Sequence, residues 1–460
     1  MAAPLVIVAN RLPVEPSTPG GQAWSRTPGG LVSALATVMG GRHGSWVGWA
    51  GSGDDAGSLP RDTGFDLHLV DLEETEVDGY YDGFANATLW PLYHAGVEPA
   101  EFHRHWWAAY QRVNARFARV VSDLAPRRAT VWIHDYHLQL VPAMLREARP
   151  DVRIGFYLHI PFPPGELFLQ LPWRRQILSG MLGADVVGFQ VPDGARNFSR
   201  LAVRLCGARP VPGAVVHEGR AVRLGAFPIS IDSQAWNELG ASPGTEERAR
   251  ALRARLGEPR SVLLGIDRLD STKGIGERLR AFEELLSTGR VKAPETVLVQ
   301  VAVPSRDRSQ AYRRQRDMVE QLVGRINGEY GEVGAPAVHY VHQSFSPADL
   351  AALYRAADVM LVTSLQDGMN LVAKEYVACR VADPGVLVLS EFAGAAHEMR
   401  SALLVNPYDL DGLQDVIVRA LEMPPADMRR RMRSLRRTVA TNTVYTWSDR
   451  FLTLLEHDAA

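Results

Sequence analysis

Short apolar runs alternate with helical patterns along the chain, and this alternation restarts once near the middle. In the first half, runs such as 5–9, 131–134 and 184–189 are separated by helical stretches. A polar, arginine-rich segment at 237–258 follows, and the alternation then resumes at 262–266. Strands and helices that alternate in this way are typical of parallel sheets covered by helices on both faces. The sequence therefore predicts two α/β domains.

The size of the chain supports this division, because 460 residues exceed what one ordinary hydrophobic core holds together. We expect residues 1–236 and 237–440 to form two Rossmann-like domains that face each other across a cleft. Residues 441–460 are expected to form a C-terminal helix that could pack back on the first domain.

Composition excludes several classes of function. The net charge of −2 and the lack of a basic tail argue against a nucleic-acid-binding protein. No apolar run approaches the roughly 18 residues of a membrane helix, and the first apolar run reads as a buried strand rather than a signal peptide. Two cysteines, Cys206 and Cys379, are too few for a disulfide framework. We therefore expect a cytoplasmic protein.

One segment combines a predicted strand at 359–362 with a polar loop and a following helix. Asp367 or Asn370 could cap that helix, whose free backbone N–H groups and dipole would attract an anion. Glu375 lies about one turn inside the helix, where its carboxylate could accept hydrogen bonds from paired sugar hydroxyls, and Lys374 is beside it. This arrangement predicts a ligand that carries both phosphate and sugar.

A basic loop opens the second domain directly after its first predicted strand. It carries Arg268 and Lys273, which could neutralise a departing diphosphate as a divalent metal does in other enzymes. The structural alternative is that these cations form salt bridges with Asp267 or Asp270. Arg306 follows a later strand and offers another anion-binding side chain.

The first domain has polar and aromatic candidates of its own. Arg11 stands at the carboxyl end of the first strand, where α/β sheets bind ligands. The glycine pair Gly29 and Gly30 would allow the backbone to approach a phosphate closely. Tyr81 and Trp90 lie in an aromatic segment whose rings could stack on sugars, although most of that segment is expected to be core.

Histidines follow two further strands. His134 and His137 flank Asp135, but two histidines three residues apart with no supporting carboxylate cluster make a poor zinc site. We expect no metal here, and expect Asp135 to accept a hydrogen bond from a substrate hydroxyl. His159 stands at another strand end and is expected to face a ligand. The glycine-rich segment 51–57 has one residue too many for a dinucleotide fingerprint, which disfavours a nicotinamide dehydrogenase.

These segments together resemble the trehalose-6-phosphate synthase family, which are retaining glycosyltransferases of the two-domain GT-B type. The resemblance runs from Arg11 to about Asp409. It rests on the strings IHDYHLQLVP, FYLHIPFPP, VPSR, GRINGEYG and DGMNLVAKEYVA. One position departs from the family, because Ser271 stands in the basic loop where a tyrosine is usual. The two cations remain, and the loop is expected to be looser.

The resemblance implies a role for each matching position. Arg268 and Lys273 would bind the donor diphosphate, and Glu375 would hold the donor ribose. The remaining residues that the resemblance assigns to the donor are Gly29, Gly30, His159, Asp367, Gly368, Met369, Asn370 and Leu371. The residues that it assigns to the acceptor are Arg11 and Arg306 for the phosphate, and Tyr81, Trp90 and Asp135 for the sugar.

The implied reaction moves glucose from a nucleoside diphosphate glucose to glucose 6-phosphate and needs no cofactor. No paired carboxylates suggest a nucleophile for double displacement, so a front-face mechanism is implied. A related transferase with another acceptor remains open, such as a glucosylglycerol phosphate synthase or a pseudo-glycosyltransferase. So does a non-catalytic sugar-phosphate sensor, although such a sensor has no need of leaving-group cations. The nucleotide base is not predicted, and family habit suggests a homo-oligomer.

Overall fold

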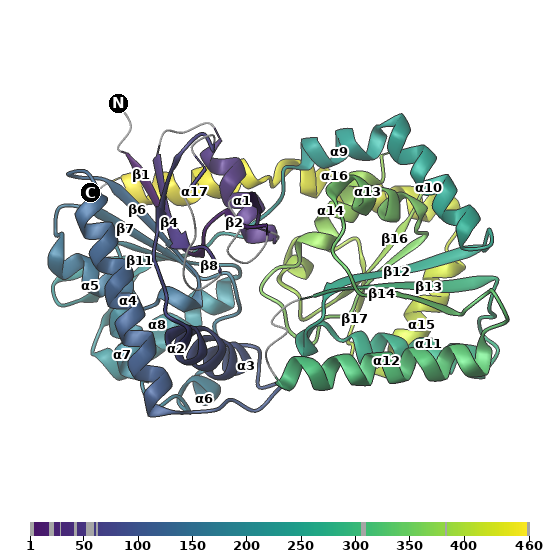
Figure 1. Cartoon of the computed structure of the whole chain (residues 1–460), viewed down its shortest axis with the longest axis horizontal. Helices are drawn as coiled ribbons and strands as arrows, with labels where there is room; N and C mark the ends of the chain where they lie inside the picture. Colours follow the sequence, from purple (N-terminus) through teal and green to yellow (C-terminus); the bar gives the residue numbers. More distant parts are fainter. Residues whose placement is uncertain are drawn as a thin grey trace. The chain divides into compact units, whose positions relative to one another are not determined.

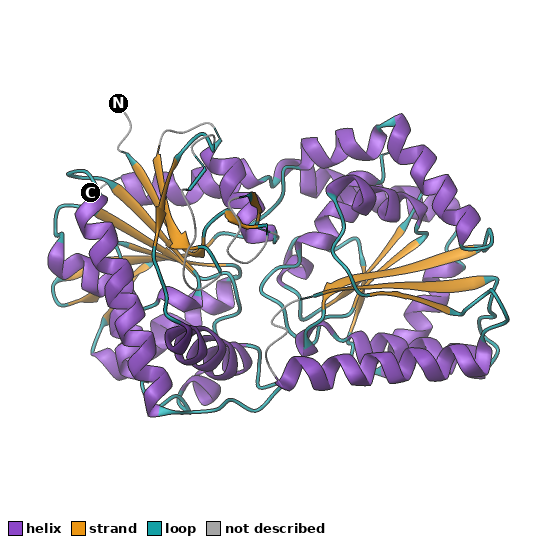
Figure 2. Ribbon diagram, viewed as in Figure 1, coloured by secondary structure: helices purple, strands orange, loops and turns teal. Residues whose placement is uncertain are grey.

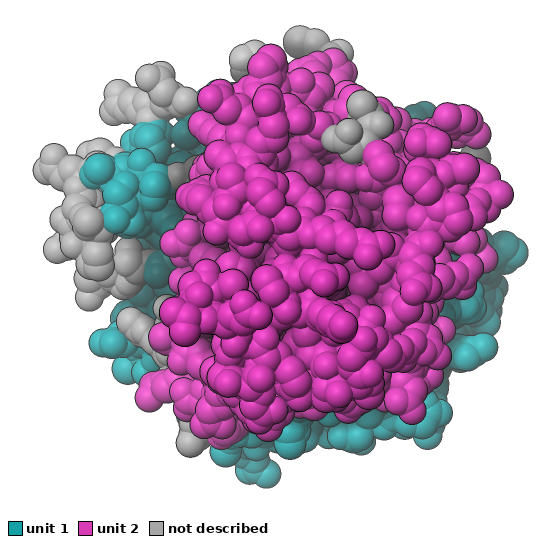
Figure 3. Space-filling model, turned by 90° about the vertical axis from the view of Figure 1, so that its right-hand side faces the viewer, with its two compact units in different colours: residues 1–229, 444–460 teal, residues 230–443 magenta. Residues whose placement is uncertain are grey.

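The computed structural model describes residues 4–17, 23–27, 29–40, 44–51, 59–60, 63–304, 310–381 and 384–457. The chain forms two compact units, coloured separately in Figure 3. Unit 1 comprises residues 1–229 and 444–460, and unit 2 comprises residues 230–443. The domain division expected from the sequence, at 236/237 and 440/441, stays a prediction. None of the described helices combines the length and the apolar character needed to cross a membrane.

Unit 1 is built around a nine-stranded sheet of order β5-β4-β1-β6-β7-β8-β11-β10-β9 (Figure 1). Its first seven strands in that order are parallel, and β10 runs antiparallel to both of its neighbours. The strands are β1 (Leu5–Arg11), β4 (Gly44–Trp49), β5 (Asp66–Leu69), β6 (Thr130–His134), β7 (Arg153–Tyr157), β8 (Val186–Phe189), β9 (Arg209–Val211), β10 (Ala214–His217) and β11 (Arg220–Ala226). A separate hairpin joins β2 (Val14–Pro16) to β3 (Trp24–Arg26).

Helices cover both faces of this sheet (Figure 2). They are α1 (Gly30–Met39), α2 (Glu74–Glu76), α3 (Trp90–Tyr93), α4 (Arg104–Leu124), α5 (Val141–Ala148), α6 (Gly165–Phe168), α7 (Arg174–Leu182), α8 (Pro192–Cys206) and α17 (Val444–Glu456), with a 3-10 helix η2 (Tyr136–Leu138). The last of these, α17, packs on β7 and β8. Gly155 and Gly188 make room for it, since a Cβ atom at either position would lie 2.6–2.7 Å from the ring of Phe451.

The aromatic segment singled out in the sequence forms a π-helix, η1 (Val77–Leu89). Two glycines let it approach α4 closely: a Cβ atom on Gly83 would lie 2.6 Å from the ring of Trp106, and one on Gly79 would lie 2.8 Å from Ala109. Much of the segment is core, as expected, and the ring of Tyr80 is fully buried. π-helices are rare and often occur at functional sites.

Unit 2 contains a parallel six-stranded sheet of order β14-β13-β12-β15-β16-β17 (Figure 1). Its strands are β12 (Ser261–Arg268), β13 (Thr296–Val303), β14 (Val338–Val341), β15 (Val359–Val362), β16 (Val386–Ser390) and β17 (Leu403–Val405). The strands are almost entirely buried where helices cover them; β15 and β16 carry no exposed side chain. Uninterrupted runs of valine and leucine are what a sheet covered on both faces requires.

The helices of unit 2 are α9 (Ser233–Ala241), α10 (Pro243–Arg255), α11 (Ile275–Ser287), α12 (Gln310–Tyr330), α13 (Pro347–Ala356), α14 (Leu371–Cys379), α15 (Leu410–Leu421) and α16 (Pro425–Thr441), with the 3-10 helices η3 (Ser271–Lys273) and η4 (Gly394–His397). The polar segment at 237–258 contains the end of α9 and the whole of α10. Ser242 ends α9 and caps α10, because its hydroxyl accepts a hydrogen bond from the backbone N–H of Thr245 at 3.2 Å.

The predicted strands of both sheets are confirmed to within two residues at each end. Short strands were missed: β17 and the β9–β10–β11 meander lack the long apolar runs that mark the other strands. Whether such segments form strands depends on the neighbouring strands with which they pair, and local sequence patterns do not contain that information.

Candidate active site

Each sheet reverses the order of its parallel strands once, and several of the predicted site residues follow the strands at that point. In unit 1 the reversal lies between β1 and β6, and in unit 2 it lies between β12 and β15. A crevice opens at the carboxyl ends of two such strands in α/β sheets, and ligands bind there. Arg11 and Asp135 occupy these ends in unit 1, and Arg268 and the loop before α14 occupy them in unit 2.

In unit 2 the structure joins a predicted cation to a predicted carboxylate. Lys273 Nζ lies 2.6 Å from Asp367 Oδ2, and both side chains are largely buried. Asp367 also accepts hydrogen bonds from the side chains of Ser364 and Asn370, at 3.3 and 3.2 Å. The two loops are fastened by a backbone hydrogen bond of 2.8 Å from Leu365 N to the carbonyl of Thr272. The basic loop and the loop before α14 are thus in direct contact.

Arg268 is the exposed last residue of β12. The residue before it, Asp267, belongs to a buried ion pair. Arg278 Nη1 donates to Asp267 Oδ2 at 2.7 Å and to Gln300 Oε1 at 2.8 Å. Burial raises the pKa of Asp267, and Arg278 opposes that rise. Asp267 is therefore paired with Arg278, and Lys273 is bound to Asp367 instead of Asp267. Sequence analysis missed Arg278, whose position in the apolar face of α11 was the available signal.

The turn before α14 has a tightly defined backbone. Asn370, one of the two predicted candidates, caps the helix. Its Oδ1 accepts a hydrogen bond from the backbone N–H of Ala373 at 3.0 Å, and its φ angle is +88°. Gly394 packs so closely that any side chain there would collide with the carbonyl of Gly368. The N–H of Gly394 donates to the carbonyl of Asp367 at 3.1 Å. Residues 368–371 are therefore held in one conformation at the N-terminus of the helix.

Glu375 and Lys374, adjacent on α14, have different surroundings. Glu375 is half-buried, and its Oε2 accepts a hydrogen bond from the hydroxyl of Tyr354 at 2.8 Å. Burial raises the pKa of Glu375 to about 7, although Tyr354 favours the carboxylate. Lys374 is 1% exposed and is paired with Glu398 at 2.7 Å. The ammonium group of Lys374 is therefore held in the interior.

In unit 1, aromatic rings connect the predicted acceptor residues. The guanidinium of Arg11 lies over the ring of Trp49, 5.0 Å from its centroid, and donates to Glu15 Oε2 at 2.8 Å. Tyr81 meets Trp49 edge to face at 5.7 Å and stacks on His137 at 5.7 Å. Arg11 and Tyr81 are thus linked through one indole ring, which the sequence analysis did not select.

Asp135 and Trp90 lie at the carboxyl end of β6. Asp135 has a φ of +75°, a conformation that is costly for a residue other than glycine. Its Oδ1 accepts a hydrogen bond from the backbone N–H of His159 at 3.1 Å, which ties β6 to β7. Trp90 is buried, and its ring packs on the ring of Tyr136, the residue after Asp135, with centroids 5.7 Å apart. No group of three or more His, Cys, Asp or Glu side chains arranged to hold a metal ion occurs among the described residues.

The remaining predicted features are the glycine pair, Arg306 and the rejected glycine-rich segment. Gly29 and Gly30 are exposed and begin α1, with Gly29 at a φ of +133°. Arg306 lies outside the described residues, and so does 52–57 of the rejected glycine-rich segment.

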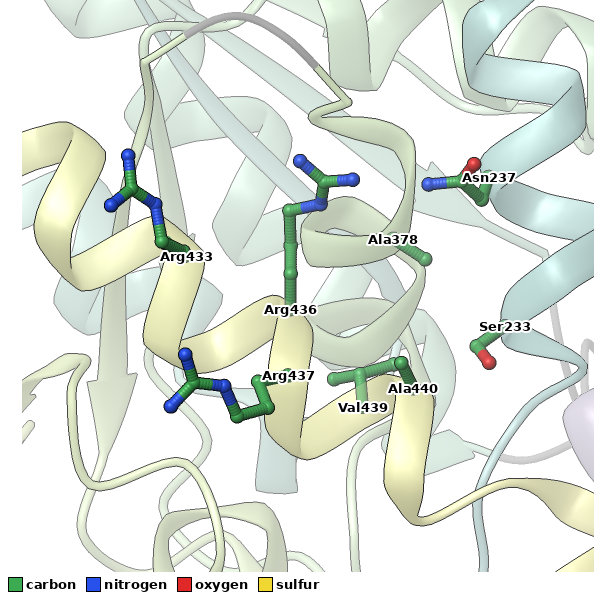
Figure 4. A pocket seen from close by; sticks show the side chains of 8 residues that line it. All are labelled: Ser233, Asn237, Ala378, Arg433, Arg436, Arg437, Val439 and Ala440. Atoms are coloured by element: carbon green, nitrogen blue, oxygen red, sulfur yellow. The ribbon is translucent and has the colours of Figure 1, made fainter.

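A cavity of about 330 Å³ lies in unit 2 beside α9, α14 and α16 (Figure 4). Asn237, Ala378, Arg436 and Arg437 are among the residues that line it. The guanidinium of Arg436 donates to the carbonyl of Val381. None of the predicted site residues lines this cavity, so it is separate from the cluster formed by Lys273 and Asp367.

Comparison with known proteins gives matches along nearly the whole chain. Residues 3–457 match the model of glycosyltransferase family 20. The chain is similar to the trehalose-6-phosphate synthase of Mycobacterium avium (strain 104), with 54% identity over 98% of this chain and 94% of that protein. It is 53% identical to the trehalose-6-phosphate synthase of Mycobacterium tuberculosis (strain ATCC 25618 / H37Rv), over 98% of this chain and 94% of that one.

Solved structures are similar over equally long ranges. An alpha,alpha-trehalose-phosphate synthase (UDP-forming) from Burkholderia xenovorans, in complex with glucose-6-phosphate, has a TM-score of 0.92 at 36% identity and covers 99% of this chain and 100% of that one. A structure described as "Trehalose-6-phosphate from E. coli bound with UDP-2-fluoro glucose" has a TM-score of 0.90 at 35% identity, with 99% and 100% covered. These matches confirm the predicted GT-B class with two Rossmann-like domains, and they confirm the resemblance seen in the motifs. The chain therefore belongs to glycosyltransferase family 20.

Proposed function

We propose that the chain transfers glucose from uridine diphosphate glucose to glucose 6-phosphate, with retention at the anomeric carbon, to form α,α-trehalose 6-phosphate. Relatives named trehalose-6-phosphate synthase, and similar structures with glucose-6-phosphate or a fluorinated UDP-glucose, support this substrate pair. The observation that carries the proposal is the contact of Lys273 with Asp367 beside Arg268 at the strand-order reversal of unit 2.

The donor is assigned to unit 2. Arg268 and Lys273 supply two positive charges for the diphosphate, and the N-terminus of α14 adds its dipole. When the diphosphate binds, the ammonium of Lys273 exchanges Asp367 for a phosphate oxygen. This exchange frees the oxygens of Asp367 for hydroxyls of the glucose, alongside the turn at 368–371. Glu375, oriented by Tyr354, accepts hydrogen bonds from the ribose hydroxyls.

Most of the residues assigned to the acceptor belong to unit 1. The phosphate of glucose 6-phosphate binds the guanidinium of Arg11, which Glu15 and Trp49 already hold in place. Arg306 is assigned to the same phosphate. Tyr81, Trp90 and Asp135 position the acceptor sugar, because fixed rings and a carboxylate match its apolar faces and its hydroxyls.

The chemical step is a front-face displacement. The bond from the anomeric carbon to the diphosphate oxygen breaks, and a bond to the acceptor hydroxyl oxygen forms on the same face. The hydroxyl proton passes to an oxygen of the leaving phosphate, so UDP leaves with that proton. Arg268 and Lys273 stabilise the negative charge that develops on the diphosphate, and such fixed charges act most strongly where water is excluded.

A panel of donors and acceptors tests the proposal. Purified protein is mixed with glucose 6-phosphate and UDP-, GDP- or ADP-glucose, and products are identified by NMR of their anomeric protons. The expected result is an α,α-linked disaccharide phosphate formed fastest from UDP-glucose. A faster reaction with another nucleotide would reject the donor assignment, and preferred transfer to glycerol 3-phosphate would reject the acceptor. Absence of product with every donor would reject the reaction.

We propose that the protein is located in the cytoplasm. Cys206 and Cys379 are both free thiols, which supports a reducing cytoplasm. The predicted homo-oligomer stays a prediction.

A further inference from the structure

Two histidines form a hydrogen-bonded pair at the carboxyl ends of β6 and β7. His134 Nδ1 lies 3.0 Å from His159 Nε2. His134 is fully buried and His159 is half-buried. A hydrogen bond between two ring nitrogens needs one donor and one acceptor, so one of these nitrogens carries a proton and the other carries a lone pair.

Both rings are neutral at physiological pH. Burial lowers the pKa of His134 well below its ordinary value, and the neighbouring His159 lowers it further. Burial also lowers the pKa of His159 to about 3. Each ring therefore carries one proton, and the choice of tautomer on one ring determines the tautomer on the other.

The surroundings of His134 determine which nitrogen donates. If His159 donated from Nε2, the single proton of His134 would lie on its own Nε2, which is buried and has no hydrogen-bond partner among the described residues. Buried N–H groups without an acceptor are rarer than under-satisfied acceptors. The favoured arrangement therefore places the proton of His134 on Nδ1, so that His134 donates to His159.

The neighbouring rings agree with this arrangement. Trp132 and Trp447 pack on His134, with centroids 4.6 and 6.5 Å away. Each has a buried indole N–H that lacks a partner in the described part of the chain. An indole nitrogen can only donate, so neither Trp132 nor Trp447 offers an acceptor for a proton on His134 Nε2.

His159 is held so that its other nitrogen remains available. Its backbone N–H donates to Asp135 at 3.1 Å, and its carbonyl accepts from Gln190 at 3.3 Å. Its ring packs beside Tyr157 and Trp447, with centroids 4.6 and 6.1 Å away. A ring that accepts at Nε2 carries its proton on Nδ1.

We propose that His134 is a positioning residue that fixes His159 in the Nδ1–H tautomer, so that His159 donates a hydrogen bond to a hydroxyl oxygen of the transferred glucose. This inference rests on the proposed contact of His159 with that sugar. In the opposite tautomer, Nδ1 would be an acceptor.

A double-mutant cycle tests the coupling. His159→Ala should lower kcat/KM about tenfold, the effect of losing one useful hydrogen bond. His134→Leu should cause a similar loss, and the double variant should be no slower than His159→Ala alone. His134→Asn should restore most of the rate, because its amide nitrogen can replace Nδ1 as the donor. His339→Leu is the matched control, since it removes a partly buried strand histidine of unit 2 and should leave the rate unchanged.

The outcomes separate this inference from the assignment of His159. Full activity of His159→Ala would reject the contact with glucose and the inference with it. A slow His159→Ala variant beside a fully active His134→Leu variant, or losses that multiply in the double variant, would reject only the positioning role.

An NMR measurement on the unaltered protein gives a second test that does not depend on the stability of any variant. Histidine is labelled with ¹⁵N in both ring nitrogens, and the His159 signals are identified by their loss in His159→Ala. The expected spectrum shows a proton bonded to Nδ1 and a lone pair on Nε2. A proton on His159 Nε2 would overturn the proposal.

Discussion

The proposed ligand sites of the two units are built from different interactions. In unit 2, the functional groups are ions that hold one another: Lys273 binds Asp367, and Arg278 binds Asp267. In unit 1, the predicted side chains are held by rings, as Trp49 joins Arg11 to Tyr81.

This difference follows from the ligand that each site is proposed to bind. A site for a diphosphate needs positive charges in a dry environment, and such charges are unfavourable until each has a partner. The carboxylates of unit 2 supply that partner while the donor is absent. A site for a sugar needs flat apolar surfaces and oriented polar groups, which rigid aromatic packing provides without extra charge. Each of the following substitutions tests either the ionic site of unit 2 or the aromatic site of unit 1.

The largest effect is expected for Arg278→Met, which leaves Asp267 buried without its cation. Breaking a buried ion pair in this way costs about 3–5 kcal/mol in the free energy of unfolding. Urea denaturation followed by circular dichroism measures that loss. Arg325→Met removes an exposed ion pair with Glu283 in the same unit and is the matched control. Equal stability of the two variants would show that the buried pair does not support the ionic site.

Lys273→Ala should lower kcat by about 10²–10³, because a fixed positive charge at the leaving group is lost. The melting temperature should fall less than in Arg278→Met, because Asp367 keeps its hydrogen bonds from Ser364 and Asn370. Lys292→Ala, at an exposed lysine of unit 2, should match the unaltered protein in steady-state kinetics. A marked drop in melting temperature with near-normal turnover would instead assign Lys273 a structural role.

Glu375 gives a pH-dependent prediction. Its folded-state pKa is raised to about 7 by burial, so the carboxylate that accepts the ribose hydrogen bonds is lost as the pH falls through about 7. The KM for UDP-glucose should therefore rise below pH 7. Glu375→Gln should raise this KM by roughly 10- to 150-fold at pH 8, the value of one charged hydrogen bond, and should abolish the pH dependence.

The carboxyl group of Glu375 should affect the stability of the fold in the opposite direction: raising the pH favours binding of UDP-glucose but lowers the free energy of unfolding. A raised pKa means that the folded state binds more protons than the unfolded state between about 4.5 and about 7, so stability falls as the pH rises through this range. Above pH 7, Glu375→Gln is expected to unfold at a higher urea concentration than the unaltered protein. A lower midpoint would contradict a desolvated carboxylate.

The smallest effect is expected in unit 1. Trp49→Leu removes the ring that carries Arg11 and should raise the KM for glucose 6-phosphate about 2- to 30-fold, the range for a cation–π contact. The KM for UDP-glucose should not change. If both constants rose equally, the separation of an aromatic acceptor site from an ionic donor site would be rejected.

Local patterns predicted most of the fold and part of the site. The strand at 359–362 was predicted at its observed bounds, because an uninterrupted apolar run is long enough to report a buried parallel strand. The cap at Asn370 was one of two candidates, since an amide before an apolar run is a local signal.

The rest depended on contacts between distant segments. Glu375 was selected from the sequence, but Tyr354, which orients it, stands 21 residues away on another helix. His134 was considered only as a metal ligand, because nothing in the chain indicates that its Nδ1 meets His159. The partner of Lys374 was not predicted for the same reason, since Glu398 lies 24 residues away in the chain.

The sequence by itself determined which residues stand at strand ends and helix starts, because strand and helix periodicity and caps act within a few residues. Only the tertiary structure decided how those residues are charged and oriented. The pKa of Glu375, the tautomers of the histidine pair and the partner of each lysine depend on burial and on atoms brought close by the folding of separate strands and helices.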